Sequence, residues 1–237
     1  MKKPQLNSVP ALALGILSIA TAAQADLITS SAGLPPIGGV YLGENVHQIY
    51  GGAALAFLLS LPTHRDFILH ELPQQQGLDQ MEFFTSMLDA NLEVFVNGIS
   101  QGVNPITTMG SVQTVVHNRY NGPNSEILTG TFQTEMLQLD LQGGGLPPGV
   151  MIRESPTLQS LGQTKITDIG GGLYKIDSFF DVFTELSIDG GQTWMPGSNT
   201  VGGPPAPGHV TLVPEPTSMS LLAAGFVGMM GFIRRRR

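Results

Sequence analysis

The chain has 237 residues, of which 12% are charged, and it contains no cysteine. Six of its eleven basic residues lie at the two ends, so residues 26–213 carry five basic and seventeen acidic side chains, a net charge of −12. A domain this acidic repels phosphate backbones, which excludes nucleic acid as a partner. Without cysteine the chain has no disulfides, no thiolate metal sites and no cysteine nucleophile.

An apolar run at the amino-terminal end, Val9–Ala23, follows two lysines and leads into a small-x-small sequence. These are the three parts of a secretory signal peptide. The run is too short for a comfortable membrane span, which argues against the alternative of an N-terminal anchor. We therefore expect residues 1–25 to be a signal peptide and the body to be exported. The expected cleavage site is formed by Ala23, Ala25 and Asp26.

The body, residues 26–201, consists of alternating or β-branched stretches separated by glycine, proline and asparagine. Ile127–Leu141 alternates most regularly, Ser111–His117 is β-branched, and Asn97-Gly98 is the strongest two-residue hairpin signal. Strands at this spacing, with few helix signals, predict a mainly β domain with an antiparallel β-sandwich-like fold.

Two apolar segments leave the type of element open. Ile49–Leu61 stops at Pro62 and has the composition of either a helix or a buried strand. Gly77–Asn91 fits either a short helix or a bent strand. The remaining signals in the body favour strands, so both alternatives are compatible with a mainly β domain.

One eight-residue stretch, residues 187–194, resembles the Asp-box pattern Ser/Thr-x-Asp-x-Gly-x-Thr-Trp/Phe. A carboxylate in this place accepts hydrogen bonds from the amides of a turn, and glycine permits the positive φ that the turn requires. Asp-boxes recur in sialidase-like propellers, whereas a single copy implies a structural turn and brings no catalytic acid pair. We expect a β-hairpin turn built by Ser187, Asp189, Gly191, Thr193 and Trp194.

Two polar clusters are candidate metal sites. If residues 177–189 form one strand, four acidic side chains share a face, and oxygen ligands of this kind bind Ca²⁺. His64, Asp66 and His70 would likewise share one face of a strand. No further ligand follows at metal-site spacing, so we favour a solvated face and a polar-edged strand, and expect no cofactor. The four acidic residues are Asp177, Asp181, Glu185 and Asp189.

One catalytic-looking motif, Gly98–Gly102, matches Gly-x-Ser-x-Gly. A nucleophile elbow needs a strand before the serine and a helix directly after it. Pro105 leaves no room for that helix, and the hairpin turn explains the glycines without chemistry. We therefore expect no catalytic residue.

The carboxyl-terminal part begins with a Pro/Gly-rich stretch, so we expect a linker and the last strand over residues 202–213. Residues 217–233 carry no charge and as a helix span about 25 Å, just short of a ~30 Å hydrocarbon core. They predict a C-terminal transmembrane helix with the body on the exported side. The cytoplasmic flank of this helix is formed by Arg234, Arg235, Arg236 and Arg237.

The whole tail, residues 214–237, resembles the PEP-CTERM sorting signal. It combines a Pro-Glu-Pro motif, an apolar span and an arginine cluster, and a signal peptide stands at the other end of the chain. The resemblance implies recognition by an exosortase, a membrane-embedded transpeptidase-like enzyme, and cleavage near the motif. The motif residues are Pro214, Glu215 and Pro216.

The same resemblance implies a location and partners. Before processing, the protein is expected in the inner membrane with its body on the periplasmic side, and afterwards at the cell surface or in the extracellular matrix. We predict a non-enzymatic surface or biofilm-matrix protein, with exosortase and extracellular polysaccharide as partners. The alternative is a secreted carbohydrate-binding or carbohydrate-active protein, which the Asp-box and the acidic surface suggest.

Overall fold

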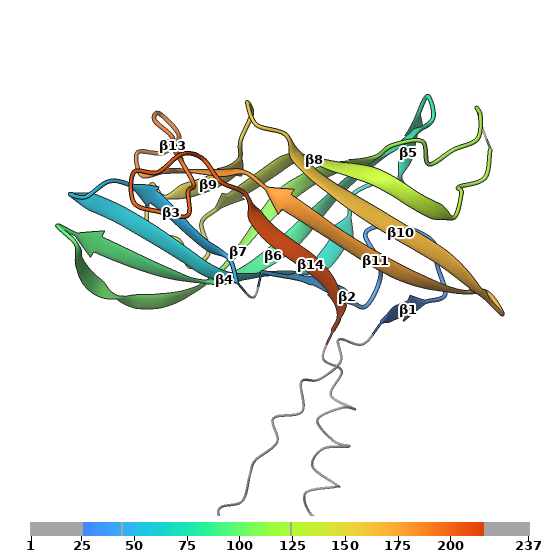
Figure 1. Ribbon diagram of the computed structural model, residues 1–237, viewed down its shortest axis with the longest axis horizontal. Helices are drawn as coiled ribbons and strands as arrows, with labels where there is room; N and C mark the ends of the chain where they lie inside the picture. Colours follow the sequence, from blue (N-terminus) through green and yellow to red (C-terminus); the bar gives the residue numbers. More distant parts are fainter. Residues whose placement is uncertain (1–25, 44, 124, 216–237) are drawn as a thin grey trace, which may run out of the picture.

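The computed structural model describes residues 26–43, 45–123 and 125–215 (Figure 1). In this part of the chain every regular element is a β-strand, and all strand pairs are antiparallel. The strands are β1 (Leu27–Thr29), β2 (Gly39–Leu42), β3 (His47–Gly51), β4 (Leu55–Leu69), β5 (Gln74–Gln76), β6 (Asp79–Val96), β7 (Ile99–Val116), β8 (Gly130–Gln142), β9 (Met151–Glu154), β10 (Ser160–Gly170), β11 (Leu173–Val182), β12 (Thr184–Ser187), β13 (Met195–Pro196) and β14 (Gly208–Pro214).

Eight of these strands close into a barrel, in the order β11–β14–β2–β4–β6–β7–β8–β10 and back to β11. The closing contacts place Gly162 of β10 opposite Thr134 of β8 on one side and Phe180 of β11 on the other. The prediction of a mainly β, antiparallel domain is confirmed, whereas the prediction of a sandwich is wrong. Sandwiches and barrels share strand lengths and turn signals, and only long-range pairings distinguish them.

The longest hairpin of the barrel joins β6 to β7, each of 18 residues. Its turn is Asn97-Gly98, with φ values of 50° and 77°, as a two-residue type I′ turn requires. The hairpin predicted at this dipeptide is therefore present. Of the two segments whose type was open, Gly77–Asn91 lies mainly in β6 and Ile49–Leu61 is divided between β3 and β4, so both are strands.

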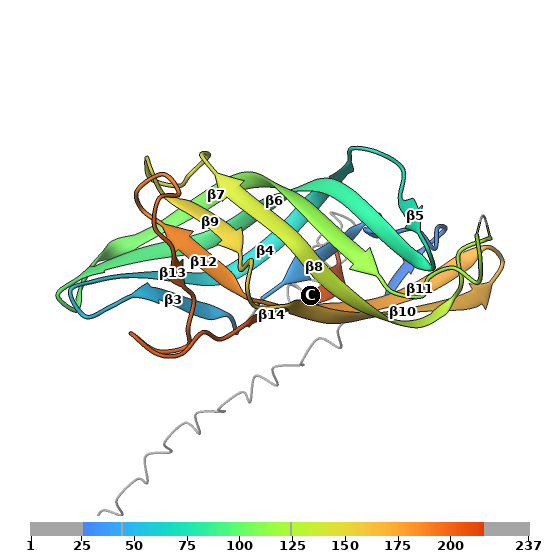
Figure 2. The same ribbon diagram turned by 90° about the horizontal axis from the view of Figure 1, so that it is seen from above.

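The barrel interior is built by the alternation of side chains along the strands. In β6 every second side chain from Gln80 to Leu92 is buried, which is the period of a strand with one face in the core. Figure 2 shows β4, β6, β7 and β8 side by side, crossing the barrel obliquely. The main hydrophobic cluster includes Tyr50, Leu88, Leu141 and Leu186, each at most 1% exposed.

A second hydrophobic cluster fills the end of the barrel where β1 lies. It combines residues of the N-terminal segment with residues of the barrel strands, namely Leu27, Ala32, Leu34, Val116, Phe132, Ile166, Ile176 and Leu212. The segment between β1 and β2 therefore packs across this end and contributes to the core. Fully burying side chains of this size stabilises a fold by about 1.5–3 kcal/mol each.

The stretch expected to link the body to its tail lies inside the domain. Residues 202–207 connect β13 to β14 and fold back on the preceding turn, because Ser198 pairs with Pro205 and Ala206 N donates to Gly197 O at 3.0 Å. The last strand, expected over Val210–Val213, is β14, which lies between β11 and β2. Pro/Gly composition marks turns within a domain as well as linkers, which explains the difference.

No helix long and apolar enough to cross a membrane occurs in residues 26–43, 45–123 and 125–215. The predicted signal peptide, residues 1–25, and the predicted transmembrane helix, residues 217–233, lie outside these ranges.

Closure of the barrel depends on glycine at a close approach between strands. A Cβ on Gly110 of β7 would lie 2.0 Å from the Asp140 carbonyl oxygen of β8. We expect Gly110→Ala to lower the free energy of unfolding by about 1–3 kcal/mol, because the two strands must move apart. Urea denaturation checks this. Gly52→Ala is the matched control, since nothing lies within 4 Å of its added Cβ, and equal stabilities of the two variants would contradict the prediction.

Candidate functional site

The described part of the sorting motif lies at the end of the last barrel strand. Pro214 is opposite Gly39 of β2, and Glu215 N donates to Gly38 O at 2.9 Å. Pro216 and the four terminal arginines lie outside the described residues. The motif therefore begins where the barrel is complete, with no spacer between the fold and the motif.

The predicted first residue of the mature chain lies at the same end. The Asp26 carboxylate is 2.7 Å from Lys175 Nζ on β11, and Leu27 directly follows in β1. Side chains of Leu27 and Leu212 both border Gly39, which places the beginning of β1 near the end of β14. The first and the last described residues of the chain thus lie close together on the barrel (Figure 1).

The Asp-box forms the predicted turn after β12. Asp189 Oδ1 accepts hydrogen bonds from the backbone N–H of Gln192 and of Thr193, both at 2.9 Å. Oδ2 accepts the Thr193 hydroxyl at 2.6 Å, and the buried Ser187 hydroxyl donates to Oδ1 at 2.7 Å. Gly191 has a φ of 89°, and its amide donates to Ser187 Oγ at 2.9 Å. The side chains of Ser187, Asp189 and Thr193 are thus all hydrogen-bonded within the turn.

Trp194, the last residue of the box, fixes the turn to the neighbouring strands. Its indole N–H donates to the Gly191 carbonyl at 3.0 Å, and the Arg153 guanidinium lies 3.9 Å above its ring. Arg153 in turn donates two hydrogen bonds to Glu185 Oε2, at 2.7 and 2.9 Å. This stack of ring, guanidinium and carboxylate gives the box a structural role.

The four acidic side chains that are candidate Ca²⁺ ligands each have a different partner in the fold. Asp177 lies near Lys175, Asp181 accepts from His209, Glu185 pairs with Arg153, and Asp189 is used in its turn. β11 ends at Val182 and pairs with β14, whereas β12 begins at Thr184 and pairs with β9, so residues 177–189 do not form the single strand that was assumed.

The histidine cluster is separated as well. A bulge between Arg65 and Ile68, with Asp66 at φ 53°, interrupts the alternation of β4. His64 therefore faces the interior, where its Nδ1 is 3.2 Å from Ser86 Oγ, whereas His70 hydrogen bonds to the exposed Thr85. Among the residues that the structure describes, no group of three or more such side chains is placed to hold a metal ion.

Ser100 of the Gly-x-Ser-x-Gly motif lies near the start of β7, and its hydroxyl donates to Glu93 of the partner strand. The strand continues to Val116, so the helix that a nucleophile elbow requires is not formed. The motif belongs to the β6–β7 hairpin.

The barrel interior holds a buried carboxyl group that the sequence did not single out. Glu82 is 3% exposed and accepts from Gln80 Nε2 at 2.7 Å and from Thr114 Oγ1 at 3.0 Å. Burial raises the pKa of Glu82 to about 7, against the opposing effect of these two hydrogen bonds and of Arg119. The carboxyl group thus changes its protonation state near neutral pH, well above the pH at which an exposed glutamate does so.

Arg119 is the second unpredicted feature of the interior, and it is fully buried. Its Nη2 donates to the Ala32 carbonyl at 2.6 Å, and its guanidinium lies 4.9 Å above the Phe132 ring. Its Nε and Nη1 have no hydrogen-bond partner, and burial lowers its pKa. The only signal in the sequence is that Arg119 is one of five basic residues in the body, which does not distinguish it from the others.

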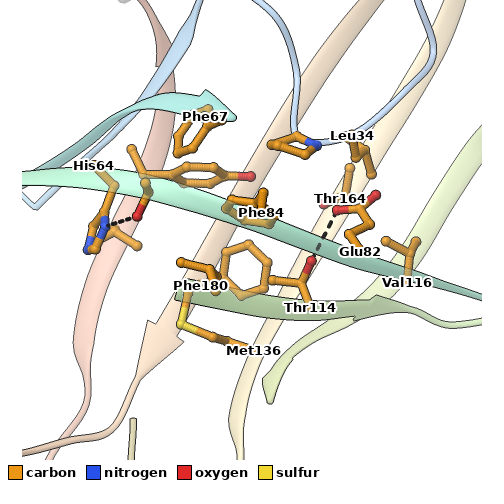
Figure 3. A pocket seen from close by; sticks show the side chains of 15 residues that line it. Leu34, His64, Phe67, Glu82, Phe84, Thr114, Val116, Met136, Thr164 and Phe180 are labelled. Carbon is orange, nitrogen blue, oxygen red and sulfur yellow. Dashed lines mark hydrogen bonds between the residues drawn. The ribbon is translucent and has the colours of Figure 1, made fainter. Parts of the chain in front are cut away.

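A cavity of about 30 Å³ lies beside Glu82. Figure 3 shows Glu82 and Thr114 at one side of it and His64 at the other, with the rings of Phe67, Phe84 and Phe180 between them. Burial lowers the pKa of His64 to about 4, so this imidazole is neutral. A cavity this small has room for about two water molecules. In this conformation the interior is a packed core that takes no larger ligand.

A groove on the outside of the barrel has a volume of about 440 Å³. It lies between the β2–β3 connection, β14 and the residues that follow β13. Its lining residues, called the groove residues below, are Leu42, Asn45, Val46, His47, Gln48, Asn199, Pro207, Gly208, His209 and Thr211.

One side of the groove holds a chain of three hydrogen-bonded side chains. His209 Nδ1 lies 2.7 Å from Asp181 Oδ1, and its Nε2 lies 3.2 Å from Thr211 Oγ1. The order of carboxylate, imidazole and hydroxyl is that of a hydrolytic triad. Thr211, however, lies within β14 with β11 on one side and β2 on the other, so the amides around it belong to the sheet and offer no oxyanion hole. The trio gives the groove an oriented, hydrogen-bonding wall.

The fold and the tail together define an exported β-barrel protein with a C-terminal sorting signal. The family model of the PEP-CTERM protein-sorting motif matches residues 212–237. The predicted resemblance is thereby confirmed: the protein carries the sorting motif of exosortase substrates and is exported through a membrane-anchored precursor. Comparisons with curated proteins and with solved structures gave no match.

The structural role of the Asp-box can be measured through the single tryptophan. Hydrogen bonds from the Thr193 side chain and backbone, with that of Ser187, lower the pKa of Asp189 to about 2. The stabilisation is present above pH about 4 and is lost as the pH falls through about 2. We expect Asp189→Ala to lower the melting temperature by several degrees at pH 7 and to shift Trp194 emission to the red.

The matched control is Asp168→Ala, which removes an exposed turn carboxylate that accepts from Gly170 N, away from the tryptophan. Its emission spectrum should equal that of the wild type. An unshifted Trp194 spectrum in Asp189→Ala would show that the box does not hold the turn.

The raised pKa of Glu82 has a consequence for stability. Because the folded state keeps this proton longer than the unfolded state, the free energy of unfolding falls as pH rises from about 4.5 to about 7. Glu82→Gln should remove this part of the fall and be more stable at pH 8 by about 1–3 kcal/mol, since part of the gain is lost with the attraction to Arg119.

Urea denaturation at a series of pH values checks this, with Glu126→Gln as an exposed control. Glu154, whose pKa burial also raises to about 7, contributes to the same pH range, so the difference between wild type and variant is the relevant quantity. A difference that stays constant from pH 4 to 8 would contradict the prediction.

Proposed function

We propose that this protein is an exported cell-surface or extracellular-matrix protein whose barrel is the delivered body and has no catalytic activity of its own. Exosortase processes the tail, and the barrel stays as the mature protein. The observation that carries the proposal is the position of the motif, which begins on the last residue of β14. Cleavage on the carboxyl side of Pro-Glu-Pro then leaves all barrel strands intact.

The geometry of the polar side chains supports a non-catalytic body. The buried Glu82 is enclosed in a packed interior, and the partly buried Glu185 and Asp189 are each used in structural contacts. The trio that includes Thr211 has no oxyanion hole beside it. A general acid, base or nucleophile needs access to a substrate and a stabilised transition state, and these groups lack one or the other.

The sorting step is tested by replacing Pro214, Glu215 and Pro216 with alanine in the host that makes the protein. We expect the variant to remain in the inner-membrane fraction at the mass of the precursor, while the wild type moves to the surface or the medium. Cell fractionation and mass spectrometry of the mature C-terminus give the two readouts.

The matched control is Pro204→Ala, which alters an exposed proline in the β13–β14 connection and leaves the motif intact. It should be processed like the wild type. Normal processing of the triple variant, or a mature C-terminus that lies before residue 208, would refute the proposal.

A further inference from the structure

The groove on the outside of the barrel has the properties of a ligand site. Its volume of about 440 Å³ lies within the range of small-molecule sites, about 300–1,000 Å³. Its walls come from segments that are far apart in the sequence and are fixed to one another. Ile49 pairs with Ser198, with two backbone hydrogen bonds of 2.8 and 3.0 Å, so the wall that carries Asn199 is bound to β3.

The polar side chains that line the groove can both donate and accept hydrogen bonds. Its polar side chains are two asparagines, a glutamine, two histidines and a threonine, and no lysine, arginine, aspartate or glutamate is among the groove residues. Amides and hydroxyls each both donate and accept hydrogen bonds, and an imidazole ring offers two nitrogen atoms for hydrogen bonding. A hydroxyl group on a ligand has the same two capacities, so a surface of this kind matches a polyhydroxylated molecule.

The charge of the surroundings selects against ions. The body carries a net charge of −12, which repels an anionic ligand, and the groove has no basic side chain to compensate. Among the described residues, the Asp181 carboxylate is bonded to the groove residue His209 at 2.7 Å and is thereby not free for a cation. A neutral ligand is therefore the class that fits.

One groove residue has a hydrogen-bonding capacity that the fold leaves unused. Gln48 is 3% exposed, and its Oε1 is buried without a partner. A buried unpaired acceptor costs about 1–3 kcal/mol, so its retention needs an explanation. The apolar residues Val46 and Leu42 line the same groove and would contact the C–H faces of a sugar ring.

We propose that the groove binds a neutral saccharide, held by hydrogen bonds from Asn45, His47, Gln48 and Asn199 and by the oriented imidazole of His209. The proposal deepens the proposed function by naming the class of partner that the delivered barrel takes. It rests on the groove alone and does not depend on the sorting step, so the two are tested separately.

The test is calorimetric titration of the full chain, purified in a zwitterionic detergent that has no sugar head group. The probes are neutral tetrasaccharides of α- and β-linked glucose, mannose and galactose, with tetragalacturonate as the anionic comparison. We expect at least one neutral tetrasaccharide to bind and tetragalacturonate to bind at least tenfold more weakly. The double variant His47→Ala/Asn199→Ala should lose at least tenfold in affinity.

Two further variants separate binding from folding. His70→Ala/Asn104→Ala removes an exposed histidine and an exposed asparagine outside the groove and should bind like the wild type. Gln48→Leu should weaken binding at least threefold while the melting temperature stays equal or rises, because an unpaired buried acceptor is removed. A purely structural Gln48 would instead give a lower melting temperature.

Three results would overturn the proposal that the groove binds a neutral saccharide. These are the absence of binding to every neutral tetrasaccharide, affinity that the groove double variant retains, and stronger binding of tetragalacturonate than of the neutral probes. None of them bears on the sorting step, which is read in cells from the location and C-terminus of the protein.

Discussion

The pairing of β10 with β8 on one side and with β11 on the other is the constraint on which the rest of the structure depends. It converts a long sheet into a closed ring and removes the free edges of the eight barrel strands. The strands approach so closely that Gly110 and Gly162 have no room for a Cβ. The inward side chains then fill the interior, as in other barrels of this size. Features that contact solvent or partners therefore lie on the outside or at the ends.

The filled interior also explains the buried charge. Moving a guanidinium out of water costs several kcal/mol, and Arg119 recovers part of this through the Ala32 carbonyl and the Phe132 ring. The same contacts fasten the segment between β1 and β2 across one end of the barrel. Glu82 lies near enough to attract Arg119, but burial raises the pKa of its carboxyl to about 7, so the negative charge is only partly present near neutral pH. Burial of Arg119 thus has an electrostatic cost, and the contacts that offset part of it also fix the position of the N-terminal segment.

Features encoded by a few neighbouring residues could be predicted from the sequence. Asn97-Gly98 specifies its turn through two residues with positive φ, and the Asp-box specifies its own through one carboxylate and the amides that follow. The barrel could not be predicted, because β2 and β14 are about as far apart in sequence as the body allows and pair only in space. The groove and the burial of Arg119 were missed for the same reason, since several distant segments create each of them. The acidic face failed because each carboxylate has its own partner in the fold: Asp181 pairs with His209, Glu185 with Arg153, and Asp189 with the amides of its turn.

The position of β14 between β11 and β2 has a consequence for biogenesis. The second strand of the chain pairs with β4 on one side, and it gains its other neighbour only when residues 208–214 are available, the last of which begins the sorting motif. Contacts between such distant segments form late in folding, because the intervening loop must close first. Completion of the barrel and presentation of the motif are therefore set by the same few residues. A chain truncated anywhere in its body would lack both the last barrel strand and the sorting motif.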